Sequence, residues 1–207
     1  MVPEKKRKIA KILSAVVGIA GILVIIGWIF DIDILKSITP SWVSMKFDTA
    51  IAFVLSGITV YFIVLAVEGE FDKAQVVLSI TSLIIVLLMG ILFFSAILGI
   101  QTGAEDLFVK EKVVAPMSAA PGRPSIPTMI NFILIAVAGG FTMFDSVKLR
   151  LQLRIVGLIV GAIGALAVAG YIIDAPLMYY YIEGINSAMA CHTAVLFMLL
   201  GIGLLCL

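Results

Sequence analysis

Charged side chains are scarce in this chain. Asp, Glu, Lys and Arg make up 13% of its 207 residues, whereas soluble domains carry roughly 25%. Hydrophobic residues reach 62%, which is more apolar surface than a water-soluble domain buries. The net charge of +1 gives no electrostatic basis for binding phosphate backbones. The scarcity of charge therefore predicts a protein of the lipid bilayer and excludes nucleic acid as a partner.

Histidine and cysteine are almost missing. His192 is the only histidine, which excludes a haem held by two histidines of one chain. We expect it to bond a loop carbonyl, and a haem held by His192 and a methionine is the less favoured alternative. Cys191 and Cys206 are expected on one helix, about 22 Å apart, too far for a disulfide. Phosphate-binding loops, zinc-protease helices and Gly-x-Ser-x-Gly motifs are also absent. We therefore expect no enzyme activity, no cofactor and no metal site.

Long apolar stretches fill most of the chain. A helix that crosses a hydrocarbon layer of about 30 Å needs about 20 mostly apolar residues. The sequence predicts an all-α integral membrane protein with six transmembrane helices. The first stretch follows the basic residues 5–8, but it is too long for the core of a signal peptide, so we expect it to be retained. The six stretches are Ile9–Phe30, Thr49–Val67, Ala74–Ile100, Ile126–Phe144, Ile155–Ile173 and Ala188–Leu207.

The two sides of the predicted bundle differ in basic charge. The side of the N-terminus has nine Lys and Arg residues, and the opposite, outer side has five. Because cytoplasmic loops are enriched in Lys and Arg, we expect a multi-pass protein of the cell membrane with both termini in the cytoplasm. The nine are Lys5, Lys6, Arg7, Lys8, Lys11, Lys73, Lys148, Arg150 and Arg154, and the five are Lys36, Lys46, Lys110, Lys112 and Arg123.

One motif occurs three times. In each copy a threonine is followed four positions later by a phenylalanine, and four positions after that by a small residue. Each copy opens an apolar stretch that follows another apolar stretch and a loop. The sequence therefore predicts a single transmembrane domain, 1–207, of three sequential helical hairpins at about 9–67, 74–144 and 155–207. The copies are Thr49, Phe53 and Gly57; Thr128, Phe132 and Ala136; and Thr193, Phe197 and Gly201.

The spacing of the motif places its three residues on one face of a helix. Threonine and small residues on such a face favour close contact between helices in lipid. We therefore interpret the motif as a packing motif, and the alternative is that the three threonine faces converge and line one cavity. A second small-residue surface contains Gly157 and Gly161. It indicates helix packing inside the bundle, with the seam of a homodimer as the alternative.

Polar and aromatic residues collect in the predicted outer loops. The helix ends 27–31 and 170–174 share the pattern glycine, aromatic, two apolar residues and aspartate, and 99–101 is a weaker third version. Loops on one face often carry binding groups. An Arg–Asp pair that locks the loops and an interfacial aromatic belt are the structural alternatives for the same residues. The candidate ligand-binding residues are Trp28, Asp31, Trp42, Arg123, Tyr171, Asp174 and His192.

These motifs together resemble a known family. Ser44–Gly57 resembles the Met-Ser-x-x-Thr-Ala-x-x-Phe-x-Leu-x-Gly motif of the multi-span N-terminal sensor regions of prokaryotic histidine kinases and diguanylate cyclases. Ala120–Ser125 and Met189–Ala194 are similar to two further motifs of these regions, with Pro124 where methionine is usual. The resemblance implies a membrane-embedded sensory domain that reads an unknown ligand or membrane state and acts on a cytoplasmic kinase or cyclase module.

One feature departs from that family. Its members continue into a cytoplasmic catalytic part, whereas this sequence stops in apolar residues at Leu207. We expect either a piece of a longer sensor or a free-standing relative that acts through a partner. The alternative function is a non-catalytic accessory subunit of a larger membrane complex that holds lipid or quinone between its helices.

Overall fold

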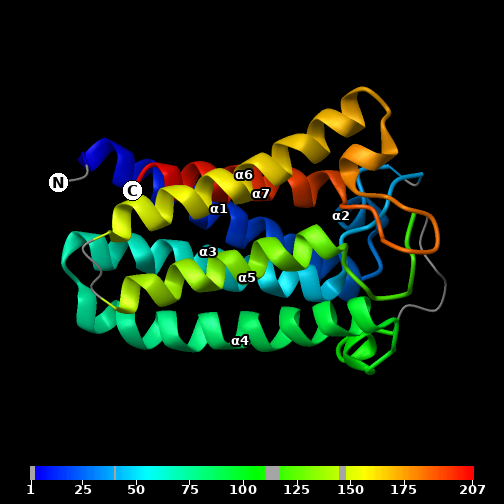
Figure 1. The fold of residues 1–207 in the computed structure, drawn as a ribbon, viewed down its shortest axis with the longest axis horizontal. Coiled ribbons are helices and arrows are strands. Elements are labelled where there is room, and N and C mark those ends of the chain that lie inside the picture. The colour runs from blue at the N-terminus through cyan, green and yellow to red at the C-terminus, as the bar shows by residue number, and fades with distance from the viewer. Residues whose placement is uncertain (1–2, 40, 111–116, 145–147) are drawn as a thin grey trace.

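The computed structural model describes residues 3–39, 41–110, 117–144 and 148–207 and shows an all-helical protein (Figure 1). Within these residues the only β-type pairing is an isolated bridge between Ile182 and Asn186. Lys112, one of the predicted outer charges, lies outside the described residues. The helices are α1 Glu4–Ile29, α2 Asp33–Lys36, α3 Phe47–Glu68, α4 Phe71–Leu98, α5 Ile126–Met143, α6 Leu149–Ile172 and α7 Cys191–Leu205, with short 3-10 helices η1 Ala104–Asp106 and η2 Pro176–Tyr179.

Five of these helices, α1, α3, α4, α5 and α6, are long and apolar enough to cross a membrane. The sixth predicted span corresponds to α7, which is apolar but has only 15 residues. At 1.5 Å per residue α7 is about 22 Å long, shorter than the roughly 30 Å of a hydrocarbon layer. The apolar helices support a membrane protein, and by helix length the described residues provide five spans.

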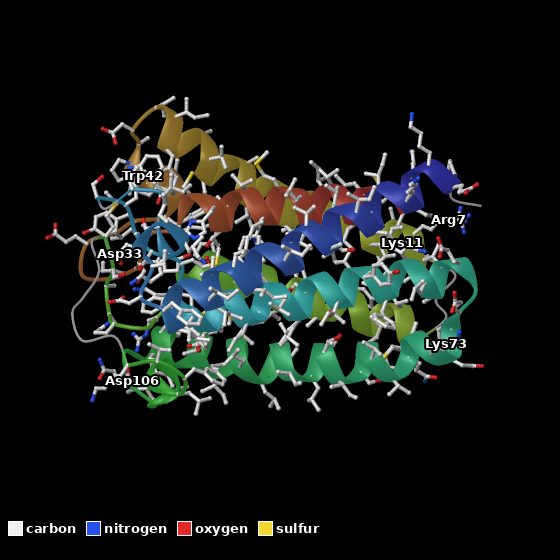
Figure 2. The ribbon with its side chains drawn as sticks, turned by 180° about the vertical axis from the view of Figure 1, so that it is seen from behind. Arg7, Lys11, Asp33, Trp42, Lys73 and Asp106 are labelled. Atoms are coloured by element: carbon white, nitrogen blue, oxygen red, sulfur yellow. The ribbon has the colours of Figure 1, made fainter. Side chains whose placement is uncertain are left out.

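The long axis of the molecule is followed by α1, α3, α4, α5, α6 and α7 (Figure 1). Both termini lie at one end, together with the connection between α3 and α4; we call this the terminal end. The long connections between α1 and α3, α4 and α5, and α6 and α7 lie at the opposite end, which we call the loop end. Figure 2 shows Arg7, Lys11 and Lys73 at the terminal end and Asp33 and Asp106 at the loop end.

The helices form an inner and an outer layer. Half of the spanning part of α3 and of α5 is buried, against 28% in α1, 39% in α4 and 33% in α6. The most extensive contacts join α1 to α3, α4 to α5 and α6 to α7. Further contacts join α3 to α4, α5 to α6 and α7 to α1, so every outer helix bridges two inner helices. The hydrophobic core therefore lies along α3, α5 and α7.

Two of these helix pairs pack backbone to backbone. A Cβ atom added to Gly57 of α3 would lie 2.6 Å from the Ser14 carbonyl oxygen of α1. A Cβ atom added to Gly201 of α7 would lie 2.6 Å from the Gly157 carbonyl oxygen and 2.6 Å from the Gly161 Cα of α6. Helix contact in lipid depends on such close approach. The small-residue surface of α6 is thus covered by α7 within the chain, and the alternative of a homodimer seam at this surface was wrong.

Large apolar side chains cover the outside of the bundle. On α1 and α4, Ile19 is 57% exposed, Val76 is 61% exposed and Leu83 is 59% exposed. At the terminal end, the Lys11 ammonium lies 2.6 Å from the Glu68 carboxylate and joins α1 to α3. Apolar helix faces of this extent require lipid as their solvent, and the charges at the ends mark where the polar surroundings begin.

Candidate functional site

Three aromatic rings meet between α3, α5 and α7. Phe53, Phe132 and Phe197 come from one helix each, and none of them is exposed. Their ring centroids lie 4.8 Å, 4.9 Å and 4.9 Å apart, within the range of favourable aromatic contact. Because each ring contacts the other two, this aromatic triad ties the three inner helices together at one depth.

The three threonines of the repeated motif lie about one helical turn before the aromatic triad, towards the loop end. Thr49, Thr128 and Thr193 are 2%, 2% and 1% exposed. All three line one small cavity, which we call the central cavity. Its volume of about 10 Å³ is close to the space that a single water molecule needs. The threonine faces therefore converge on a shared polar space above the triad.

The central cavity lies at the N-termini of the inner helices. The N-cap residues of α3, α5 and α7 are Lys46, Ser125 and Ala190, and all three line the cavity. In α5 the Ser125 hydroxyl accepts a hydrogen bond from the Thr128 N–H at 3.4 Å. Neither α3 nor α7 has a side-chain cap among the described residues. Since the first N–H groups of a helix have no partner within the helix, α3 and α7 present polar N–H groups at the cavity.

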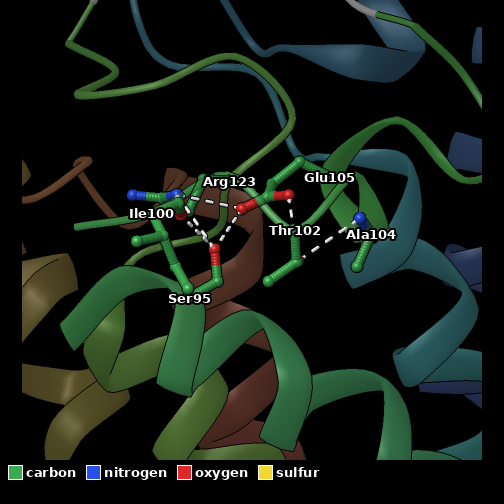
Figure 3. Close-up of polar contacts among 6 residues, drawn as sticks. All are labelled: Ser95, Ile100, Thr102, Ala104, Glu105 and Arg123. Carbon is green, nitrogen blue, oxygen red and sulfur yellow. Dashed lines mark hydrogen bonds and ion pairs between the residues drawn. The ribbon is translucent and has the colours of Figure 1, made fainter. Parts of the chain in front are cut away.

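Arg123 stands at the edge of the central cavity and is held by the loop between α4 and α5 (Figure 3). Its guanidinium Nη2 donates to the Glu105 carboxylate at 2.9 Å, to the Ile100 carbonyl oxygen at 2.6 Å and to the Ser95 hydroxyl at 3.0 Å. The Ser95 hydroxyl also donates to Glu105. The Glu105 side chain is only 6% exposed, so this ionic cluster is a buried fastening of the loop.

The charge of Glu105 depends on this cluster. Burial alone would raise the pKa of the Glu105 carboxyl, but hydrogen bonds from Ser95 and Arg123 lower it from 4.5 to about 2. The carboxyl is therefore ionised at neutral pH and pairs with Arg123. Sequence reasoning proposed an Arg–Asp pair as the alternative to a ligand, and this was wrong in the residue: the partner is Glu105 of the same loop. Sequence reasoning did not predict the short helix η1 in this loop, and it therefore had no reason to select Glu105 as a partner of Arg123.

Two aromatic side chains of the helix-end pattern clamp the starts of the following helices. The Trp28 indole N–H of α1 donates to the Met45 carbonyl oxygen at 2.9 Å. The Tyr171 hydroxyl of α6 donates to the Met189 carbonyl oxygen at 2.9 Å. Met45 and Met189 each stand four positions before the threonine of their motif. Both predicted ligand residues thus make the same structural contact at equivalent places, and neither lines the central cavity.

The helix ends before the three long loops have one geometry. Asp31, Gly99 and Asp174 adopt left-handed backbone conformations with φ of 55°, 66° and 54°. In each case the next N–H reaches back five residues to a carbonyl oxygen, which closes the helix in a Schellman arrangement. The bonds are Ile32 to Gly27 at 2.8 Å, Ile100 to Ser95 at 3.1 Å and Ala175 to Gly170 at 2.9 Å. Ser95 therefore takes the place that Gly27 and Gly170 have at the other two helix ends, and the sequence alignment of 99–101 with those ends was wrong.

The remaining candidates lie around the cavity instead of in it. The Trp42 ring lies 4.7 Å from the Tyr171 ring, which stacks at 4.3 Å on Tyr179. The Asp31 carboxylate pairs with Lys36 at 2.6 Å. Asp174 is exposed. Of the seven predicted ligand residues, the central cavity brings in Arg123 alone.

His192 lies half-buried in the first turn of α7, and its two ring nitrogens are buried. Neither ring nitrogen has a hydrogen bond within the described residues, so the expected bond to a loop carbonyl was wrong. His192 does not line the central cavity. Sequence reasoning selected Ser125 as a helix N-cap, which the structure confirms, but it missed the N-cap residues Lys46 and Ala190. Their signal was available, because each stands three positions before a motif threonine.

Neither a metal site nor a known relative defines this site further. Across the described ranges, no group of three His, Cys, Asp or Glu residues is placed to hold a metal ion. Comparisons with protein-family models, with curated proteins and with solved structures find no match for this chain. The site therefore has to be interpreted from its own geometry.

Proposed function

We propose that this chain is a membrane-embedded sensory input domain that reads a small polar ligand at the loop end. In this proposal α7 counts as a sixth span, and the six long helices are three copies of one two-helix unit. The pairs α1–α3, α4–α5 and α6–α7 are the copies. Their equivalent Schellman ends, their converging threonines and the aromatic triad support this interpretation.

The central cavity is the observation that carries the proposal. A ligand there contacts the N-termini of all three inner helices, and the aromatic triad lies about one turn below it. A ligand shifts a conformational equilibrium only through its different affinity for two states. A site at three helix starts fulfils this condition, because small shifts between α3, α5 and α7 change all of its walls.

The proposed orientation places the loop end outside the cell and both termini in the cytoplasm. The basic residues at the terminal end support it, since Lys and Arg are enriched on the cytoplasmic side. A cysteine in place of the exposed Asp33 should react with an impermeant thiol reagent in intact cells, and one in place of the exposed Lys73 should not. The background should carry Cys191→Ala and Cys206→Ala. The reverse labelling pattern would contradict the orientation.

The sensory proposal is tested by an output fusion. A histidine-kinase module fused after Leu207 should change its autophosphorylation at least fivefold when Thr49→Val and Thr193→Val are combined. Thr142→Val is the matched control, because Thr142 is 1% exposed and its hydroxyl bonds the Ala138 carbonyl oxygen of its own helix. Equal output from the double variant, the control and the unchanged chain would contradict the sensory function.

One observation favours the accessory-subunit alternative. An apolar groove of about 440 Å³ runs along α4 and is lined by Val86, Gly90 and Phe94, among others. A Cβ atom at Gly90 would contact nothing within 4 Å, so the groove is open to an acyl or isoprenoid chain. Stoichiometric lipid or quinone in the purified chain, lost in Gly90→Leu, would support this alternative.

A further inference from the structure

We propose that the central cavity is a binding site for a single halide-sized anion, with chloride as the natural candidate. The inference deepens the proposed function by naming the class of ligand. It rests on that function only for the statement that the ion is a stimulus. The binding site itself follows from the described residues around the cavity.

Three helix N-termini meet at the central cavity. The N-terminus of a helix carries a partial positive charge and free N–H groups, and it binds anions. α3, α5 and α7 have 22, 18 and 15 residues, so each has a full dipole. Their N-cap residues Lys46, Ser125 and Ala190 line the same cavity. Only α5 is capped by a side chain, and the N–H groups at the starts of α3 and α7 need an acceptor.

Buried side chains that can donate hydrogen bonds also line the central cavity. Thr49 and Thr193 line the cavity and are only 2% and 1% exposed, and no side-chain hydrogen bond joins either of them to another described residue. The Arg123 Nε atom is likewise buried without a partner among the described residues. A buried donor without an acceptor costs about 1–3 kcal/mol. Two threonines and an arginine that line one space therefore carry donor groups without an acceptor on the described residues.

Charge and size select the class of ligand. The described residues that line the cavity include Lys46 and Arg123 and no acidic residue. A cation is disfavoured, since donors and helix N-termini surround the space. The volume of about 10 Å³ fits one particle of about the size of water and favours a monatomic anion over phosphate, sulfate and carboxylates. A monatomic anion matches both constraints.

The experiment measures binding directly on the purified full chain in nanodiscs. Chloride exchange should broaden the ³⁵Cl NMR line, and bromide should reverse the broadening, whereas gluconate and sulfate at equal ionic strength should not. Combining Thr49→Val and Thr193→Val should weaken the apparent chloride affinity at least tenfold, and Thr142→Val should leave it unchanged. Broadening that is absent in the unchanged chain, or equal in the double variant, would mean that the cavity holds water only and would overturn the proposal.

A second variant guards against loss of folding. Ala190→Ser supplies α7 with the hydroxyl cap that Ser125 gives to α5, and its oxygen fills the cavity. This variant should remain folded and lose chloride-dependent broadening. Retained broadening would contradict the site.

The kinase fusion separates the two proposals. Chloride binding without a change of output overturns the sensory function and leaves the ion site. A change of output in the threonine variants without chloride binding overturns the ion site and leaves the sensory function.

Discussion

The middle helix pair, α4–α5, and the two flanking pairs, α1–α3 and α6–α7, differ in the contacts that hold their two helices and the loop between them together. In α1–α3 and α6–α7, a glycine of the inner helix contacts the outer helix backbone, and an aromatic side chain bonds a methionine carbonyl across the loop. In α4–α5 the corresponding residues are Ala136 and Ala96, which offer neither device. There the buried pair of Arg123 and Glu105 fastens the loop.

This difference shows which features the architecture requires. The left-handed helix end, the N3 threonine and the ring of the aromatic triad occur in all three pairs, because they set the direction and depth of the inner helices. The fastening of each loop is local, and either an aromatic clamp or an ion pair provides it. Bulky substitutions should therefore destabilise the flanking pairs through steric overlap, and acid should destabilise the middle pair.

The largest expected effect is steric and confined to the flanking pairs. Gly201→Leu should abolish folding or cost at least about 5 kcal/mol, because its Cβ would overlap the backbone of Gly157 and Gly161 at 2.6 Å. Gly140→Leu in the middle pair has open space around its Cβ and should be tolerated. The midpoint of thermal unfolding in detergent measures the effect of both substitutions. Equal midpoints for the two variants would contradict this difference between the flanking and the middle pairs.

Loss of one ring from the aromatic triad should affect the middle pair as strongly as the others. Phe132→Ala should cost about 3–5 kcal/mol, because a buried aromatic side chain leaves a cavity. Phe144→Ala, at a residue that is 80% exposed, is the control and should change the unfolding midpoint little. A small effect of Phe132→Ala would show that the middle helix does not share the common core.

Acid should weaken the middle pair through the loss of the Glu105 charge. Since the pKa of Glu105 is lowered from 4.5 to about 2 in the folded protein, its contribution to stability is present above pH 4.5 and is lost as pH falls towards 2. The loss should be at most about 3 kcal/mol. In Glu105→Gln the unfolding midpoint should be lower at neutral pH and flatter across this interval. An unchanged acid dependence would remove Glu105 as its source.

The smallest effect should appear at the aromatic clamps. Trp28→Phe and Tyr171→Phe each remove one hydrogen bond to a methionine carbonyl oxygen and should cost about 1 kcal/mol each. Trp42→Phe is the control, because Trp42 contributes its ring to Tyr171. Hydrogen exchange at residues 43–49 and 187–193 should rise in the matching variant only. A rise in both segments from either variant would show that the clamps are coupled.

The sequence by itself determined the helices, the bilayer as their solvent and the face on which each motif lies. Apolar length and the four-residue spacing are local properties, so the predicted stretches agree with α1 and α3 to α6 within a few residues at most ends. It overestimated α7, because Ala188–Ala190 are apolar and buried yet belong to the loop before the helix. Composition does not distinguish a buried loop from a helix.

Only the tertiary structure decided which polar groups meet. Thr49, Thr128 and Thr193 lie far apart in the chain, and their shared cavity follows from the way three inner helices pack around three phenylalanine rings. The partner of Arg123 depended on η1, a short turn that brings Glu105 under a buried guanidinium. Long-range pairing depends on the relative placement of helices. The local spacing of residues determines which face of each helix is buried, but it does not determine which other helices pack against that face.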